Sequence, residues 1–206
     1  MPETTALLRN EPVQARSTAR LSTLLDAAAQ VVDEIGYERL TTAMVAERAG
    51  ASIGTVYRYF PDRIAVLQSL GARSLGQFLE RVRPAMRDKS NWWEAVDSVF
   101  NTAVDAFTSE PGFRSLRFGD VIDVRPIAGD QTGNHIVAAE IAGALTAYGL
   151  PADDDLRLRV EVALHLSDVL LARAFAFDSH GDARIITEAR SLLRSYLTGH
   201  YGDPTV

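Results

Sequence analysis

The chain has 206 residues, of which 47% are hydrophobic, and a formal net charge of -6 at pH 7. It has enough apolar sequence to bury a core, and the absence of cysteine excludes a disulfide framework, a thiolate metal site and a cysteine nucleophile. The acidic balance argues against indiscriminate binding of nucleic acid, although it is compatible with a local basic patch. The sequence contains neither a recognisable signal peptide nor a run of about 18 apolar residues that would span a membrane. We therefore expect a cytoplasmic globular protein with no membrane partner.

Apolar residues recur at helical spacing along most of the chain and no segment alternates as a strand does, so the sequence predicts an all-α protein. Residues 1–17, which contain prolines and charges, are expected to form a flexible N-terminal arm. An amphipathic helix is predicted from Thr18 to Ile35. Thr41 or Thr42 offers an N-cap to a short second helix, and Ser52 offers one to a third. These three helices form a first domain, residues 18–62.

A fourth helix is predicted over residues 63–82, where Pro84 should prevent much continuation. It would link the first domain to a larger helical domain, residues 83–206. There Asn91, with Glu94 three residues on, has the form of a capping box before another helix. The segment 118–133 is irregular in pattern. Two long helices end the chain, at about Asp154–Asp178 and Ala183–Thr198, and the first of them is apolar on most sides, as a central buried helix would be.

The third predicted helix combines an apolar face with an unusual polar one. The apolar face is expected to anchor it on the first two helices and consists of Ile53, Val56, Tyr57 and Phe60. The opposite face offers groups that suit a DNA groove: Gly54, Thr55, Arg58 and Tyr59. Two short helices joined at Gly50 have the form of a helix-turn-helix, whose second member enters the major groove. The alternative is an ordinary helix hairpin with a solvated outer face.

The stretch LTTAMVAERAGASIGTVYRYFPDRIAVL, Leu40 to Leu67, resembles the DNA-binding signature of the TetR family of bacterial transcriptional regulators. The resemblance implies that Thr42 and Arg63 contact phosphates. It implies a recognition surface formed by Ser52, Gly54, Thr55, Tyr57, Arg58 and Tyr59. Ile53 stands where the family often has a basic residue or proline, so a contact is lost there or replaced by an apolar contact to a thymine methyl. Because residues 1–63 carry seven arginines against eight acidic residues, affinity must come from well-placed arginines, including Arg16 on the arm.

The resemblance also implies a dimer and a pocket for a small effector in residues 83–206. Aromatic residues that are candidates for lining the pocket are Trp92, Trp93, Phe100, Phe107, Phe118 and Phe175, and polar candidates are His165, Asp168, Asn134 and Arg173. Each aromatic residue has the alternative of being ordinary core. The function we expect is a homodimeric, non-enzymatic transcriptional repressor, released from a palindromic DNA operator by a small apolar or aromatic effector, with no metal and no cofactor.

Three other functions fit parts of this pattern. A transcriptional activator would use the same DNA contacts and the same fold. A helical enzyme would use His165 and Asp168 for acid–base chemistry, but no nucleophile motif or phosphate loop accompanies them. A non-specific architectural DNA binder is disfavoured by the acidic charge and the scarcity of lysine.

Overall fold

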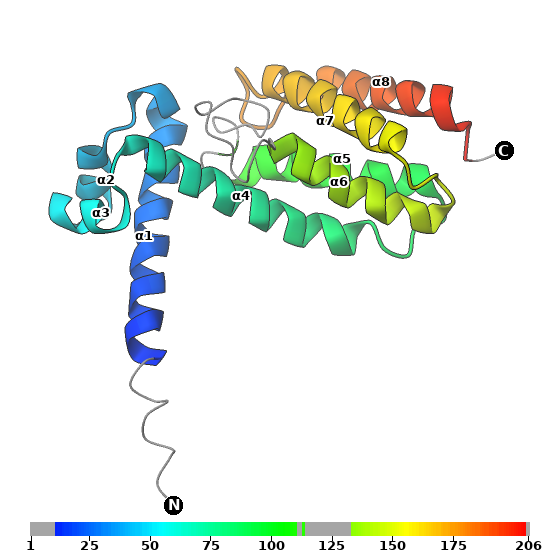
Figure 1. Ribbon diagram of the computed structural model, residues 1–206. Coiled ribbons are helices and arrows are strands. Elements are labelled where there is room, and N and C mark those ends of the chain that lie inside the picture. Colours follow the sequence, from blue (N-terminus) through cyan, green and yellow to red (C-terminus); the bar gives the residue numbers. More distant parts are fainter. Residues whose placement is uncertain (1–10, 111–112, 114–132, 205–206) are drawn as a thin grey trace, which may run out of the picture. The chain divides into compact units, whose positions relative to one another are not determined.

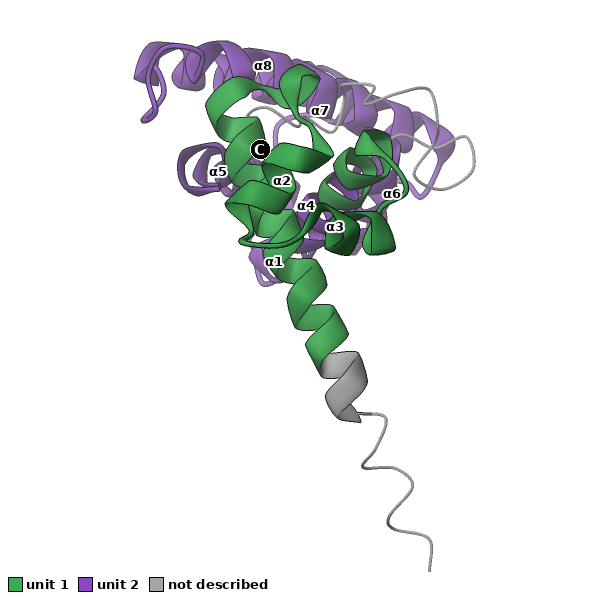
Figure 2. Ribbon diagram, turned by 90° about the vertical axis from the view of Figure 1, so that its left-hand side faces the viewer, with its two compact units in different colours: residues 1–70 green, residues 71–206 purple. Residues whose placement is uncertain are grey.

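The computed structural model describes residues 11–110, 113 and 133–204 (Figure 1). Within these residues the regular structure consists of eight α-helices and two short 3-10 helices, with no strand, which confirms the predicted all-α class. The chain divides into two compact units, residues 1–70 and 71–206, which are coloured separately in Figure 2.

The first unit is built from α1 (Glu11–Ile35), a 3-10 turn (Tyr37–Arg39), α2 (Thr42–Arg48), α3 (Ile53–Tyr59) and the first turns of α4 (Arg63–Ala85). Helix α1 packs against α2, and α2 against α3. Their core contains fully buried aliphatic side chains, among them Leu24, Val32, Leu40, Val45 and Val56.

Helix α1 begins seven residues earlier than the predicted start at Thr18, so the prediction that residues 11–17 belong to a flexible arm is wrong. The first ten residues of that arm lie outside the described part of the chain. Pro12 does not oppose the helix, because proline is tolerated in a first helical turn, where its missing N–H would have no partner. Neither glycine nor a second proline interrupts the sequence from Val13 to Ile35.

An ion pair fixes α2 on α1. The Arg48 guanidinium donates to both carboxylate oxygens of Glu34, at 2.8 and 2.6 Å. This contact lowers the pKa of Glu34 below its ordinary value and raises that of Arg48. The two-bond geometry restrains the orientation of α2, and with it the turn that leads into α3.

Helix α4 continues to Ala85, past the predicted end at Val82. Proline removes only its own N–H from the ladder, and the Met86 N–H, just past the end of the helix, donates to the carbonyl of Val82 at 3.0 Å. The boundary between the units falls within α4, between Leu70 and Gly71.

Two glycines within α4 are unexplained by packing. A Cβ atom built at Gly71 or at Gly76 meets no heavy atom within 4 Å. Glycine in a helix interior is destabilising relative to alanine. Of the two sequence interpretations, a softened helix and close packing, the structure favours softening.

The second unit contains the rest of α4, then α5 (Trp92–Ser109), α6 (Gly133–Leu145), a 3-10 turn (Thr146–Tyr148), α7 (Asp154–Ala174) and α8 (Ala183–Tyr201). The predicted N-cap is present, because Asn91 Oδ1 accepts from the Glu94 N–H at 3.0 Å, but the Glu94 carboxylate accepts from the N–H of Ser90, one residue before the position that a capping box requires, at 3.0 Å. Of the segment predicted to be irregular, residues 118–132 lie outside the described part, and Gly133 begins α6.

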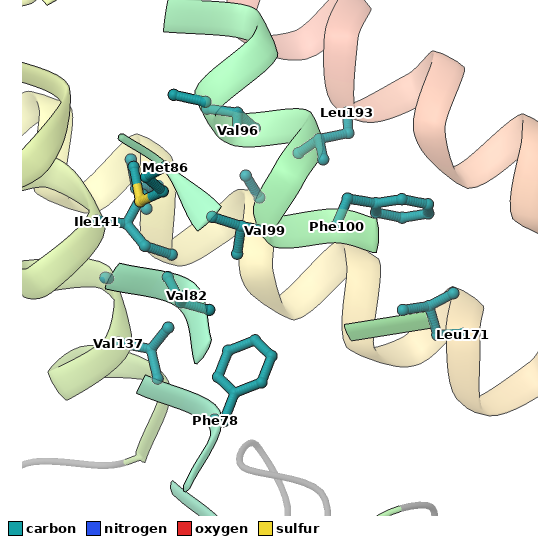
Figure 3. Close-up of a cluster of buried hydrophobic side chains, with 14 of the residues drawn as sticks. Phe78, Val82, Met86, Val96, Val99, Phe100, Val137, Ile141, Leu171 and Leu193 are labelled. Atoms are coloured by element: carbon teal, nitrogen blue, oxygen red, sulfur yellow. The ribbon is translucent and has the colours of Figure 1, made fainter. Parts of the chain in front are cut away.

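A large apolar cluster from all five helices forms the core of this unit (Figure 3). Helix α7 packs against both α6 and α8. The sequence pattern predicted a central buried helix, but one side of α7 is open in the single chain. Leu158, Leu166 and Val169 are 54%, 44% and 59% exposed there. The apolar residues of α7 thus exceed what the described chain alone can cover.

Candidate nucleic-acid interface and effector cavity

Two N-cap residues and a glycine with a left-handed backbone fix the ends of the helices in the helix-turn-helix and the turn between them. Thr41, rather than Thr42, caps α2, and its hydroxyl accepts from the Met44 N–H at 3.2 Å. Gly50 adopts φ 57 in the turn, a backbone conformation that favours glycine. Ser52 then caps α3 by accepting from the Thr55 N–H at 3.1 Å, as predicted.

Helix α3 is anchored by fewer residues than its apolar pattern predicted. Val56 and Phe60 are buried, at 0% and 2% exposure, whereas Ile53 is 43% and Tyr57 is 54% exposed. Ile53 contributes less to the anchoring face than the pattern predicted, because it stands in the first turn of the helix, and Tyr57 stands at the edge of that face with its hydroxyl exposed. Most of the surface of α3 is therefore open: Ser52, Gly54 and Arg58 are exposed, and Thr55 and Tyr59 are half-buried.

Hydroxyl groups from three helices meet around α3. The Thr42 hydroxyl donates to the Tyr57 hydroxyl at 3.3 Å, and the Tyr59 hydroxyl lies 3.3 Å from that of Ser17 on α1. The Arg58 guanidinium stands over the Tyr59 ring, 5.2 Å from its centroid. The hydrogen bond with Ser17 and the nearby Arg58 charge lower the pKa of the Tyr59 phenol. We call these five residues, Ser17, Thr42, Tyr57, Arg58 and Tyr59, the α3 surface.

Ser17 is the member of this surface that sequence reasoning missed, because it was assigned to the arm. The sequence after Pro12 contains no helix breaker, and this could have indicated that α1 includes Ser17. The longer helix places Ser17 within hydrogen-bonding distance of Tyr59 on α3. Arg16, its neighbour, is exposed. Arg63, predicted as a phosphate contact, is half-buried and donates from Nη1 to the carbonyl of Glu38 at 2.5 Å. That bond satisfies the carbonyl of Glu38 and holds the guanidinium at the start of α4.

The second unit contains a cavity of about 50 Å³ between its helices. Its lining is apolar except for one serine, and Figure 3 shows several of the lining side chains converging from different helices. The residues are Phe78, Val96, Val99, Phe100, Ala103, Ile141, Val160, Ala163, Leu164, Ser167, Leu193 and Leu197. No charged side chain is among these lining residues.

Two family models match the chain. One, described as "Bacterial regulatory proteins, tetR family", matches residues 24–70. The other, described as "Tetracyclin repressor-like, C-terminal domain", matches residues 90–201, more than half of the chain. The chain belongs to the TetR family. Apart from Ser17, the residues of the α3 surface lie in the first matched region, and most of the cavity lining lies in the second.

Individual relatives agree with this membership. The transcriptional repressor KstR of Rhodococcus jostii is 30% identical over 161 residues, which cover 77% of this chain and 72% of that protein. The fatty acid metabolism regulator protein of Bacillus subtilis is 36% identical over 78 residues, but these cover only 38% of this chain and 40% of that protein. A TetR-family regulator of Streptomyces coelicolor has a similar crystal structure, with a TM-score of 0.73 and 37% identity over 87% of this chain and 98% of that one.

Of the ten candidates for effector contact, Phe100 alone lines this cavity. Trp92 and Trp93 are buried at the start of α5, where Trp92 packs edge-on against Tyr201. Phe107 and Phe175 stack against each other with centroids 5.4 Å apart, and Phe118 lies outside the described residues. These aromatic side chains follow the alternative that the sequence left open, packing as core.

His165 and Asp168, two of the four polar candidates, lie one turn apart on α7. His165 is exposed and its Nδ1 lies 2.8 Å from the carbonyl of Glu161 on the preceding turn. Neither residue lines the cavity. No group of three or more His, Asp or Glu side chains among the described residues could hold a metal ion. In the same part of the chain no helix is long and apolar enough to cross a membrane.

Proposed function

We propose that this TetR-family protein is a transcriptional repressor that binds a palindromic operator as a homodimer and is released by a small apolar effector. The observation that carries the proposal is the α3 surface, a cluster of hydroxyls and a guanidinium around the second helix of a capped helix-turn-helix, in which Ser17, Tyr57 and Arg58 are exposed. Within it Arg58 suits base edges, and Thr42, Tyr57 and Tyr59 suit phosphates. Thr55, which neighbours this surface on α3, also suits a base edge. Gly54, whose Cβ position is open to solvent apart from the Ser52 hydroxyl at 3.9 Å, permits close approach of a DNA backbone.

Ile53 and Arg16 extend this surface. Ile53 is exposed at the start of α3, where it would contact a thymine methyl. Arg16, on the first turns of α1, would contact the phosphate backbone and contribute affinity without sequence preference. Arg63 would reach a phosphate with the guanidinium nitrogens that Glu38 does not engage.

The homodimer is supported by the uncovered apolar side chains of α7 and α8. Leu158, Leu166 and Val169 on α7 and Leu192 on α8 are each between 44% and 59% exposed. The two helices pack side by side (Figure 1), so a second copy would cover these residues with its own α7 and α8. Two recognition helices about 34 Å apart would then read both halves of a palindrome.

The effector would bind in the cavity of the second unit. Pockets for small molecules typically measure about 300–1,000 Å³, so a cavity of about 50 Å³ must enlarge to accept one. The enlarged state and the state described here therefore differ in packing. If the enlarged state holds the recognition helices at a spacing that does not fit DNA, effector binding weakens operator affinity by linkage. Phe78 lines the cavity and lies on α4, the helix that follows α3 in the chain. A displacement of Phe78 by the effector would therefore be transmitted along α4 towards the helix-turn-helix.

Selection of binding sites from random duplex DNA tests this function. The wild-type protein should enrich a palindrome. Arg58→Ala and Tyr59→Phe should weaken binding to it, and a fold-neutral control, His180→Ala in the exposed α7–α8 connection, should not. Equal recovery of unrelated duplexes, with a steep loss of binding in salt, would instead indicate non-specific DNA binding. A transcription assay with the enriched site in a promoter then separates repression from activation.

A further inference from the structure

Asn134 is a buried polar side chain whose donors the fold does not use. It lies in the first turn of α6, is 3% exposed, and its Nδ2 atom has no hydrogen-bond partner. An amide with unmade hydrogen bonds in the interior costs folding free energy, and few such groups persist in native proteins. The position is therefore better explained by a partner that arrives with a ligand.

Asn134 lies on the face of α6 that borders the cavity. Asn134, Val137 and Ile141 follow one another at helical spacing on this face, and all three are 3% exposed or less. Ile141 and Phe78 line the cavity, and Val137 belongs to the same buried apolar cluster as both (Figure 3). Seven residues separate Asn134 from Ile141, a distance of about 10 Å along the helix.

The cavity itself offers a ligand almost no polar contact. Ser167 is the one polar residue in its lining, and its hydroxyl donates to the carbonyl of Ala163 at 2.8 Å. A ligand carboxylate or ammonium group among these side chains would lose its hydration without gaining a counter-charge. The donors of Asn134 suit a neutral acceptor oxygen instead.

The volume favours an aliphatic ligand over an aromatic one. An apolar cavity that holds a benzene ring measures about 150 Å³, and this one measures about 50 Å³. A thin hydrocarbon chain can enter with smaller displacements of side chains than a flat ring requires. Leucine, valine and alanine, which supply most of the lining, match such a chain.

We propose that Asn134 selects the effector by donating a hydrogen bond to an uncharged carbonyl oxygen, as in a ketone or ester, carried at the end of an aliphatic chain that fills the cavity. This assignment rests on the proposed function, which places the effector in the second unit. It narrows the ligand class from any apolar molecule to neutral aliphatic carbonyl compounds.

Three probes with similar chains test the proposal on the full-length protein: 2-decanone, 1-decene and decanoate. Calorimetric or thermal-shift titration of the wild type should rank 2-decanone first. In Asn134→Leu, which is of similar size, the preference for 2-decanone over 1-decene should fall by about 5-fold, the usual contribution of one hydrogen bond. The ligand-free Tm of this variant should rise, because an unsatisfied amide is replaced by an apolar group. The control His180→Ala, in the exposed α7–α8 connection, should keep the wild-type preference.

Three results would overturn the proposal: no binding of 2-decanone by the wild type, tighter binding of decanoate than of 2-decanone, or an unchanged preference in Asn134→Leu. Operator binding is measured on the same samples. If the ketone preference depends on Asn134 but the ligand does not release the protein from DNA, the site is upheld and the regulatory function is contradicted. If ligands release DNA equally from the wild type and from Asn134→Leu, the regulatory function is upheld and the role of Asn134 is contradicted.

Discussion

Truncating one exposed leucine of α8 tests the proposed homodimer. Full burial of a leucine side chain contributes about 1.5–3 kcal/mol. Leu192 is 53% exposed in the single chain, so a partner that covers it gains about half of that amount. In a two-fold dimer each substitution occurs twice, and Leu192→Ala should therefore weaken association by about 1.5–3 kcal/mol. This corresponds to a dissociation constant that is about 10- to 150-fold higher.

Sedimentation over a dilution series measures that constant. Met44→Ala is the matched control, because Met44 is an apolar side chain that is 39% exposed on α2 and belongs to the first unit, whereas α7 and α8 belong to the second. The control should dimerise as the wild type does. A wild type that is monomeric throughout the series, or a Leu192→Ala variant with an unchanged constant, would refute the assignment of α7 and α8 to a dimer interface.

Three further variants have defined expectations. The double variant Gly71→Ala, Gly76→Ala should stabilise α4 by about 1 kcal/mol at each site, because neither new Cβ atom meets an obstacle. Its Tm should rise, and the effector should change its DNA affinity less than that of the wild type. A lower Tm would indicate that the glycines have a packing role. Ala163→Val should fill part of the cavity and weaken effector binding in titrations without lowering Tm by more than a few degrees; unchanged binding would place the effector elsewhere. Asp182 caps α8, and its hydrogen bonds to Arg184 lower its pKa from 3.8 to about 2. Its contribution to the stability of the folded state is therefore present at pH 7 and is lost as the pH falls from about 4 towards 2. The Tm deficit of Asp182→Ala should shrink over that range, and a deficit that persists at pH 2 would contradict the role of the carboxylate.

The sequence predicted most helices because their signals are local. A capping asparagine with a glutamate three residues on specifies the start of α5 whatever the rest of the chain does, and Ser52 does the same for α3. The early start of α1 was missed because Pro12 resembles a break in the sequence, although the first turn of a helix accommodates it.

The exposure of α3 and of α7 depends on neighbours that periodicity does not reveal. The wheel placed Ile53 and Tyr57 with the buried Val56, but a seven-residue helix that rests on its neighbours through few residues leaves its first turn open. In α7 the pattern correctly indicated apolar residues on most sides, and the single chain covers only some of them.

The cavity was predicted least well. Aromatic residues are conspicuous in sequence, yet they fill space efficiently, and Trp93 and Phe107 pack into the core. The cavity is lined instead mainly by small aliphatic residues such as Ala103 and Val99, which no local signal distinguishes from other core positions. Asn134 was a candidate polar contact in the sequence, but only its burial and its unsatisfied amide give it a defined role.

The binding stoichiometry on the enriched palindrome tests the central claim most directly. Fluorescence anisotropy would compare the palindromic duplex with the same duplex after one half-site is scrambled, at two salt concentrations. The account predicts two chains per palindrome, much weaker binding to the scrambled duplex, and loss of the difference in Arg58→Ala. Equal affinity for both duplexes, or a difference that survives in Arg58→Ala, would contradict sequence reading by paired α3 surfaces.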